Sequence, residues 1–235
     1  MKIYSNTKIF DDVDQFVCTC NFTRQLMIKG GVSKDMITVV PSFVDTDKIE
    51  PCYKNKKYFL FFGRMSVPKG LIYAIKAFNE LNNSDYKLLI TGDFSDLKEE
   101  NNYSEIKEYK KKNDNIVFTG FKKGKELDDI INNCIAVICP SIWYENMPNT
   151  VVEAYAHGKP VIASDIGSLS ELVIDNETGF LFETKNYKDL AEKMSKFISD
   201  PEIAVELGKN SRLFCVENFN MKQHIDKLIE IFEEK

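Results

Sequence analysis

The sequence predicts an α/β fold: a Rossmann-like parallel sheet with helices on both faces. Short, fully apolar runs such as 58–62 alternate with longer amphipathic segments such as 71–81. Strands that are buried on both faces appear in a sequence as continuous apolar runs, and the alternation of strands with helices is typical of βαβ units. The strands end at small or polar residues, namely Gly63, Thr91, Gly120, Pro140 and Ser164. Ligands of open α/β sheets bind at this carboxyl edge, so we expect the five following loops to converge there.

Apolar runs, helix caps and turn residues locate the individual elements. Strands are predicted at 16–20, 36–40, 58–62, 86–90, 115–119, 135–139, 160–163 and 179–182. Helices are predicted from a cap at Asn21 or Thr23 to Gly30, from Pro68 to 81, at 96–112 and 126–133, after Pro148, and at 169–174, 186–199, 201–218 and 222–233. Pro68 and Pro148 suit the first position of a helix. Residues 42–57 are polar and predict a linker.

Charge and composition argue against several classes of function. The net charge is −5 and the pI about 5.3, which disfavours a nucleic-acid partner. No apolar run approaches the roughly 20 residues of a transmembrane helix, and no signal-peptide core is visible, so a cytoplasmic protein is expected. The six cysteines form no Cys-x-x-Cys pair and only two histidines accompany them, so no metal site is predicted. Lysine clusters such as 110–112 are expected to be solvated, with a membrane-surface patch as the alternative.

The loop after the strand at 58–62 has the composition of an anion site. Gly63 allows a sharp turn off the strand, and Arg64 and Lys69 follow beside a predicted helix start. Two cations near the positive end of a helix dipole suit a diphosphate. The alternative is that both side chains are surface ion-pair partners. The loop matches neither the Walker A loop nor the G-x-G-x-x-G fingerprint.

A second loop holds two acids around a helix start. Seven residues separate Glu145 from Glu153, and Pro148 lies between them. Glu145 would precede the helix and Glu153 would lie in its second turn, so both could face one crevice. Free N–H groups of Asn149 and Thr150 would then point at an anion. In the alternative interpretation, Glu145 is a partner of the helix dipole and Glu153 is exposed.

A third loop begins at Gly120, and Phe121 could cover a nucleobase with its ring or backbone. The alternative for Phe121 is a core position. His157 is expected at a helix end near the negative pole of the dipole. Ser141 has no G-x-S-x-G context, so no hydrolase triad is predicted.

Several motifs follow one another in a characteristic order along the chain: FFGRMSVPKG, VFTGF, ELDDIINNCIAVICPS, ENMPNTVVEA and GKPVIASDIGSLSELVIDNETGFLF. The stretch VVPSFVDTDKIEP precedes them. Together they resemble the interdomain linker and the C-terminal, donor-binding half of a retaining glycosyltransferase of family 4, with the GT-B fold. The resemblance covers nearly the whole chain. It implies three parts: an acceptor-domain end with the linker at 1–50, a nucleotide-sugar-binding domain at 51–218, and an amphipathic helix at 219–235.

The resemblance assigns roles to the residues of these loops. Arg64 and Lys69 would neutralise the donor diphosphate, in place of the divalent metal that other transferases use. Glu145 would contact the sugar ring near the reacting carbon, and Glu153 would hydrogen-bond the ribose. The further donor contacts that it implies are Gly63, Phe121, Asn149 and Thr150. The sequence departs from the family's common Glu-Gly-Phe-Gly at Glu145-Asn146-Met147-Pro148.

The resemblance also implies substrates and partners. The expected donor is a UDP-sugar first and a GDP-sugar second, without a cofactor. The acceptor would be a glycan or a lipid-linked saccharide, which would place the protein peripherally at the cytosolic face of a membrane. The family's acceptor domain is largely absent from the sequence, so a partner chain is expected to supply it. The apolar stripe of the last helix, at Ile225, Leu228, Ile229 and Phe232, would then lack its usual cover.

Two other functions stay open from the sequence. The chain could be a non-catalytic nucleotide-sugar-binding or interaction module, or a subunit that needs a partner acceptor domain. It could also be another GT-B-like enzyme, such as a sugar-nucleotide epimerase or a phosphorylase. A phosphorylase would need a lysine context for pyridoxal phosphate, and the sequence has none. An epimerase would be expected to show different acidic and histidine placement.

Overall fold

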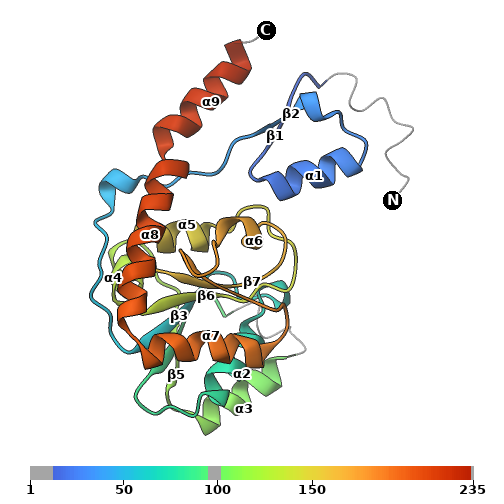
Figure 1. The fold of residues 1–235 in the computed structure, drawn as a ribbon. Helices are drawn as coiled ribbons and strands as arrows, with labels where there is room; N and C mark the ends of the chain where they lie inside the picture. The colour runs from blue at the N-terminus through green and yellow to red at the C-terminus, as the bar shows by residue number, and fades with distance from the viewer. Residues whose placement is uncertain (1–12, 95–101, 234–235) are drawn as a thin grey trace.

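The computed structural model describes residues 13–94 and 102–233, and its main body is a parallel sheet between two layers of helices (Figure 1). The strands are β1 (Phe16–Cys18), β2 (Ile37–Val39), β3 (Tyr58–Phe62), β4 (Lys87–Thr91), β5 (Ile116–Gly120), β6 (Ala136–Cys139), β7 (Val161–Ser164) and β8 (Gly179–Phe182). The helices are α1 (Asn21–Lys29), α2 (Leu71–Glu80), α3 (Tyr103–Lys112), α4 (Lys125–Asn133), α5 (Asn149–Ala156), α6 (Leu169–Leu172), α7 (Tyr187–Ser199), α8 (Glu202–Asn218) and α9 (Met221–Glu233). The predicted fold class is therefore confirmed.

The main sheet has the strand order β5-β4-β3-β6-β7-β8, and all its neighbouring strands are parallel. The chain builds outward from β3 to β5 and then returns to place β6 on the other side of β3. Strand order therefore reverses between β3 and β6, and ligands of doubly wound sheets bind at such a switch point. The loops that leave β3 and β6 are the two loops whose charged residues the sequence singled out.

Both faces of the sheet are covered, because the central strands are apolar on both sides. Every residue of β3, β6 and β7 is buried. One face packs against α2, α3 and α7, and the other against α4, α5, α6 and α8 (Figure 1). Full burial of one such large apolar side chain is worth about 1.5–3 kcal/mol. These two layers hold the strand ends, and hence the loops, in fixed positions.

Most predicted boundaries agree with the structure to within two residues, and three details need comment. Pro68 lies in a separate 3-10 turn (Val67–Lys69), and Gly70, at φ 69° and ψ 22°, divides this turn from α2. Cys20 caps α1 in place of Asn21 or Thr23, because its backbone is extended and its Sγ accepts a hydrogen bond from the Thr23 N–H at 3.4 Å. The start of the helix predicted at 96–112 lies outside the described residues.

The elements β1, α1 and β2 form a small unit that precedes the linker, and β1 and β2 pair in parallel as a sheet of their own. The linker is fixed to the main domain by polar contacts. Arg212 donates to the carbonyl oxygen of Thr46 at 2.8 Å, and the fully buried Lys159 donates to Asn55 Oδ1 at 2.7 Å. Burial lowers the pKa of Lys159, because desolvation disfavours its charged form.

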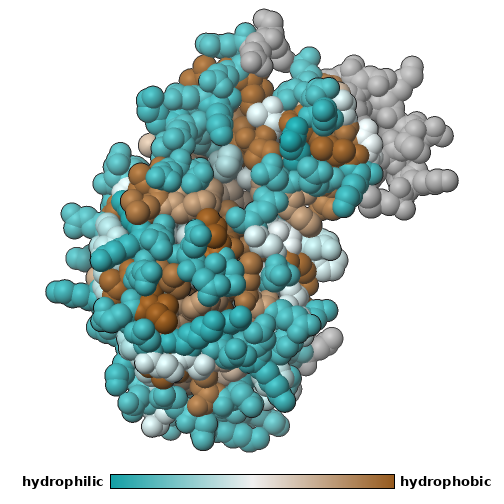
Figure 2. Space-filling model, viewed as in Figure 1, coloured by the Kyte–Doolittle hydropathy of each residue, from teal (hydrophilic) through white to brown (hydrophobic). Residues whose placement is uncertain are grey.

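The last helix, α9, has no buried residue. Ile225, Ile229 and Phe232 are exposed, and Leu228 is half-buried. Figure 2 shows apolar surface over α9 and over the β1–α1–β2 unit. Within the described ranges, most of the apolar stripe of this helix therefore faces solvent. No helix in those ranges is long and apolar enough to cross a membrane.

The substitution Gly70→Ala should destabilise the main domain. An added Cβ would collide with the carbonyl oxygen of Pro140, and the left-handed backbone at this position disfavours alanine. The control is Gly31→Ala, which also has a positive φ but no neighbour within 4 Å. In urea unfolding, the loss for Gly70→Ala should exceed that of the control by about 1–3 kcal/mol. Equal losses would contradict the tight packing of the β3 and β6 loops.

Candidate functional site

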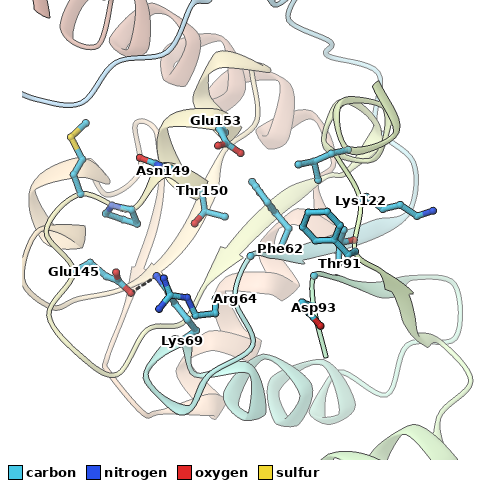
Figure 3. Close-up of a pocket in the computed structure, with 16 residues that line it drawn as sticks. Phe62, Arg64, Lys69, Thr91, Asp93, Lys122, Glu145, Asn149, Thr150 and Glu153 are labelled. Carbon is cyan, nitrogen blue, oxygen red and sulfur yellow. Dashed lines mark hydrogen bonds and ion pairs between the residues drawn. The ribbon is translucent and has the colours of Figure 1, made fainter. Parts of the chain in front are cut away.

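A cavity of about 540 Å³ opens at the carboxyl edge of the sheet (Figure 3). Its volume is typical of a small-molecule site. The loops after β3, β4, β5 and β6 and the start of α5 form its walls. The lining residues are Phe62, Gly63, Arg64, Lys69, Thr91, Gly92, Asp93, Phe121, Lys122, Leu127, Glu145, Met147, Pro148, Asn149, Thr150 and Glu153. All eight site residues predicted from the sequence are among them.

Four of the five loops expected to converge at this edge line the cavity. The fifth loop, at Ser164-Asp165, leaves the same edge of the sheet but has no residue among those that line the cavity. Asp165 accepts a hydrogen bond from Ser170 Oγ at 2.6 Å and lines a separate acidic hollow beside β8. The physical reason is that the next turn, at Gly167, packs against the side chains of Phe22 and Tyr144.

The loop after β3 brings two cations to the cavity. Gly63, at φ 123°, turns the chain off β3, and Lys69 lies in the 3-10 turn just before α2. Arg64 is exposed and points toward the same end of the cavity (Figure 3). No carboxylate of the described residues forms an ion pair with Arg64. The surface ion-pair alternative therefore has no support for Arg64.

Lys69 and Glu145 form an ion pair within the cavity. Lys69 Nζ lies 2.7 Å from Glu145 Oε1, and the two side chains are only 27% and 18% exposed. Ser141 Oγ donates to the same carboxylate oxygen at 2.8 Å. The sequence did not predict this direct pairing of the two loops. It also missed the part of Ser141, which its position four residues before Glu145 could have indicated.

Glu153 lies on α5, apart from Glu145 (Figure 3). It is half-buried, so the exposed alternative is wrong. Burial, and after it the charge of Asp128, raises the pKa of Glu153. Pro148 is the residue before the helix, at φ −71° and ψ 113°, so its expected place at the first helical position is wrong by one residue. Asn149 and Thr150 occupy the first turn of α5, whose N–H groups lack partners within a helix.

Phe121 lies at the cavity on the loop after β5, and 67% of it is exposed. The core alternative is therefore wrong. The physical reason is Gly120, whose φ of 77° turns the chain away from the sheet before Phe121. At the end of the neighbouring strand β4, Thr91, Gly92 and Asp93 also line the cavity. The sequence assigned these residues no role beyond marking the end of a strand.

The titratable residue at the end of α5, His157, has a structural role. His157 ends the helix, as expected, and is buried. Its Nδ1 lies 2.9 Å from Asn132 Oδ1, and burial lowers its pKa. It does not line the cavity.

The substitution Glu153→Gln should stabilise the free protein at pH 7. Because the folded protein binds the Glu153 proton more tightly than the unfolded chain does, its stability falls as the pH rises through the raised pKa. Urea unfolding should show the variant to be more stable at neutral pH, with the difference shrinking below the ordinary glutamate pKa of 4.5. Glu230→Gln on the exposed helix α9 is the control. A difference that does not change with pH would contradict the desolvation of Glu153.

Known proteins resemble this chain in both sequence and structure. Spore coat protein SA of Bacillus subtilis is 28% identical over 76% of this chain and 49% of its own length. The Escherichia coli UDP-Gal:alpha-D-GlcNAc-diphosphoundecaprenol alpha-1,3-galactosyltransferase is 26% identical over 93% of this chain and 59% of its length. The chain thus spans about half to two thirds of such relatives.

Solved structures share the fold. The Anabaena protein HepE, in complex with UDP and glucose, superposes with a TM-score of 0.84 at 20% identity, over 94% of this chain and 64% of HepE. A glycosyltransferase from Rickettsia africae gives 0.83 at 25% identity, over 97% of this chain and 66% of that chain. The family model "Glycosyl transferases group 1" matches residues 44–214, which include the whole cavity. The chain therefore belongs to the family of group 1 glycosyl transferases.

Proposed function

We propose that the cavity binds a nucleotide-diphospho-sugar and that the chain is the donor domain of a retaining, metal-independent glycosyltransferase. The observation that carries the proposal is the meeting of two cations and a helix N-terminus in one cavity. Arg64 and Lys69 come from the β3 loop, and the start of α5 faces them from the β6 side. Fixed cations and free N–H groups match a diphosphate.

Each end of the donor has a complementary group. Glu153, on the α5 side of the cavity, would accept hydrogen bonds from the ribose hydroxyls. Phe121, exposed on the β5 loop, would cover the base. Glu145, beside Lys69, would contact the sugar ring near the reacting carbon. Gly63 allows the backbone to pass close to the phosphates, because it has no side chain.

The chemistry asks the protein chiefly to stabilise a leaving group. The bond between the anomeric carbon and the diphosphate breaks, an acceptor hydroxyl bonds to that carbon from the same face of the sugar, and its proton passes to the departing diphosphate. Negative charge builds on the departing diphosphate. Preorganised cations and amides in a partly desolvated site stabilise such charge without a metal ion. Arg64, Lys69 and the amides of Asn149 and Thr150, which line the cavity, would supply this stabilisation.

The donor is proposed to be a UDP-sugar, with a GDP-sugar as the second candidate. The name of the Escherichia coli galactosyltransferase and the ligand of HepE both contain UDP, which supports this order. The same galactosyltransferase is named for a lipid-diphosphate-linked saccharide, which supports a glycan or lipid-linked acceptor. Such an acceptor would hold the protein at the cytosolic face of a membrane.

A second candidate is a nucleotide-sugar-binding module that works with an acceptor domain on a partner chain. The observation in its favour is that every group assigned above lines the donor cavity and would contact the donor, so the cavity fits this candidate as well. The two candidates share the donor site and differ in turnover. Slow hydrolysis of the donor by wild type, lost in a site variant, would favour the enzyme. Binding without any turnover would favour the module.

Arg64→Ala and Lys69→Met should each weaken binding of UDP by about tenfold or more, because each removes a charge-assisted contact to phosphate. The rate of donor hydrolysis should fall by about 10²–10³-fold. Lys76→Met is a matched control: Lys76 is 28% exposed and pairs with Glu105 at 2.9 Å, away from the cavity. Calorimetry and a coupled UDP assay measure the two effects, and a chelator should change neither. Equal effects of Lys69→Met and Lys76→Met would contradict the assignment.

Glu145→Gln should separate sugar binding from diphosphate binding. Loss of the carboxylate frees Lys69 from its ion pair, so the affinity for UDP alone should stay equal or rise. The additional affinity that the sugar gives to a UDP-sugar should fall by about tenfold or more. The rate of donor hydrolysis should fall as well. Glu105→Gln, which breaks the Lys76 pair, is the control. A loss of UDP affinity in Glu145→Gln would count against the role of Lys69 at the phosphates.

A further inference from the structure

The loop that carries Glu145 is held from outside by the segment that precedes the linker. The rings of Phe22 and Tyr144 lie 4.8 Å apart at 47°. Thr23 Oγ1 donates to Asn146 Oδ1 at 3.4 Å. The backbone N–H of Ser42 lies 3.1 Å from the sulfur of Met147. Three of the four residues from 144 to 147 therefore contact α1 or the first residue of the linker, although more than 100 residues of chain separate them.

Glu145 is the remaining residue of that stretch, and it faces the opposite way. Tyr144 and Asn146 are directed to α1, while the carboxylate of Glu145 meets Lys69 and Ser141 in the cavity. Glu145 lies between Tyr144 and Asn146 in the chain, so a shift of these two residues would displace its backbone and its carboxylate. The outer contacts thereby set the position of the inner carboxylate.

The contact between α1 and this loop is closely fitted. A Cβ at Gly167 would come within 3.1 Å of Tyr144 and 3.3 Å of Phe22, so the absence of a side chain there leaves room for the ring pair. The first helical N–H of α1, at Asn21, donates to the Glu171 carboxylate at 3.0 Å. A carboxylate at a helix N-terminus is favoured by the helix dipole. Two elements of the main domain, α6 and the β6 loop, thus hold the start of α1.

We propose that Phe22 and Thr23 are positioning residues for the sugar end of the donor site. They act through Tyr144 and Asn146 on Glu145, and they couple the β1–α1–β2 unit to recognition of the donor sugar. This inference rests on the proposed function, in which Glu145 contacts the sugar. It assigns to α1 a part in donor selection, although no residue of α1 lines the cavity.

The test compares two aromatic contacts of the same geometry. Phe43 of the linker and His224 of α9 also lie 4.8 Å apart at 47°, and this ring pair does not include Tyr144 or Asn146. Calorimetry would measure the affinities for UDP and UDP-glucose, or for GDP and GDP-mannose, in wild type, Phe22→Ala and Phe43→Ala. Phe22→Ala should lower the affinity for the nucleotide-sugar by about two- to tenfold and leave the affinity for the nucleotide unchanged. Phe43→Ala should change neither. An equal loss for nucleotide and nucleotide-sugar in Phe22→Ala, or no loss, would overturn the inference.

Two further variants separate positioning from general damage to the fold. Phe22→Tyr keeps the ring and should restore the wild-type ratio of the two affinities. Thr23→Val keeps the shape of the side chain but removes the hydroxyl that contacts Asn146, and it should reproduce the selective loss in a milder form. Failure of Phe22→Tyr to restore the ratio would overturn the inference.

A measurement without ligand distinguishes failure of this inference from failure of the proposed function. Hydrogen exchange of residues 141–147 should become faster in Phe22→Ala and stay unchanged in Phe43→Ala. Trp143, the only tryptophan of the chain, is 68% exposed beside Tyr144, so its emission should change in Phe22→Ala alone. If wild type binds neither donor pair, the proposed function fails while this test still decides the positioning. Unchanged exchange and emission would overturn it.

Discussion

The ion pair between Lys69 and Glu145 is the contact on which the site depends. It joins the loops after β3 and β6, which are far apart in the chain and adjacent only because strand order reverses between these strands. Both side chains are largely buried, and Ser141 adds a hydrogen bond to the same carboxylate. Removal of one partner would leave a partly buried charge without compensation, which is costly. The pair therefore links the two halves of the cavity in the free protein.

Other groups in the cavity are poorly compensated in the free protein. Arg64 has no acidic partner among the described residues, Glu153 is partly desolvated beside Asp128, and Phe121 exposes its ring. Such local violations of folding rules concentrate at functional sites, where a ligand supplies the missing contacts. The well-packed sheet beneath supplies the stability that these features cost, with β3, β6 and β7 fully buried.

The parts outside the main domain are attached in a different way. Among the described residues, the β1–α1–β2 unit contacts the β6 loop through the Phe22–Tyr144 ring pair and the hydrogen bond from Thr23, and it contacts α6 through the hydrogen bond from Asn21. Helix α9 buries none of its residues. Interfaces of this kind allow relative motion more readily than a shared apolar core does. The division at residues 50 and 218 stays a prediction, since the family match at 44–214 does not set these boundaries.

The sequence by itself determined the fold class, the order of the elements and the loops that form the site. It could do so because apolar runs, glycines and prolines act locally, and because parallel strands place their carboxyl ends on one edge. It also named Arg64, Lys69, Glu145 and Glu153 as site residues, and all four line the cavity. Tertiary structure alone decided how they meet. The pairing of Lys69 with Glu145, the outward ring of Phe121 and the contact of Phe22 with Tyr144 depend on strand order and backbone direction, which no local pattern records.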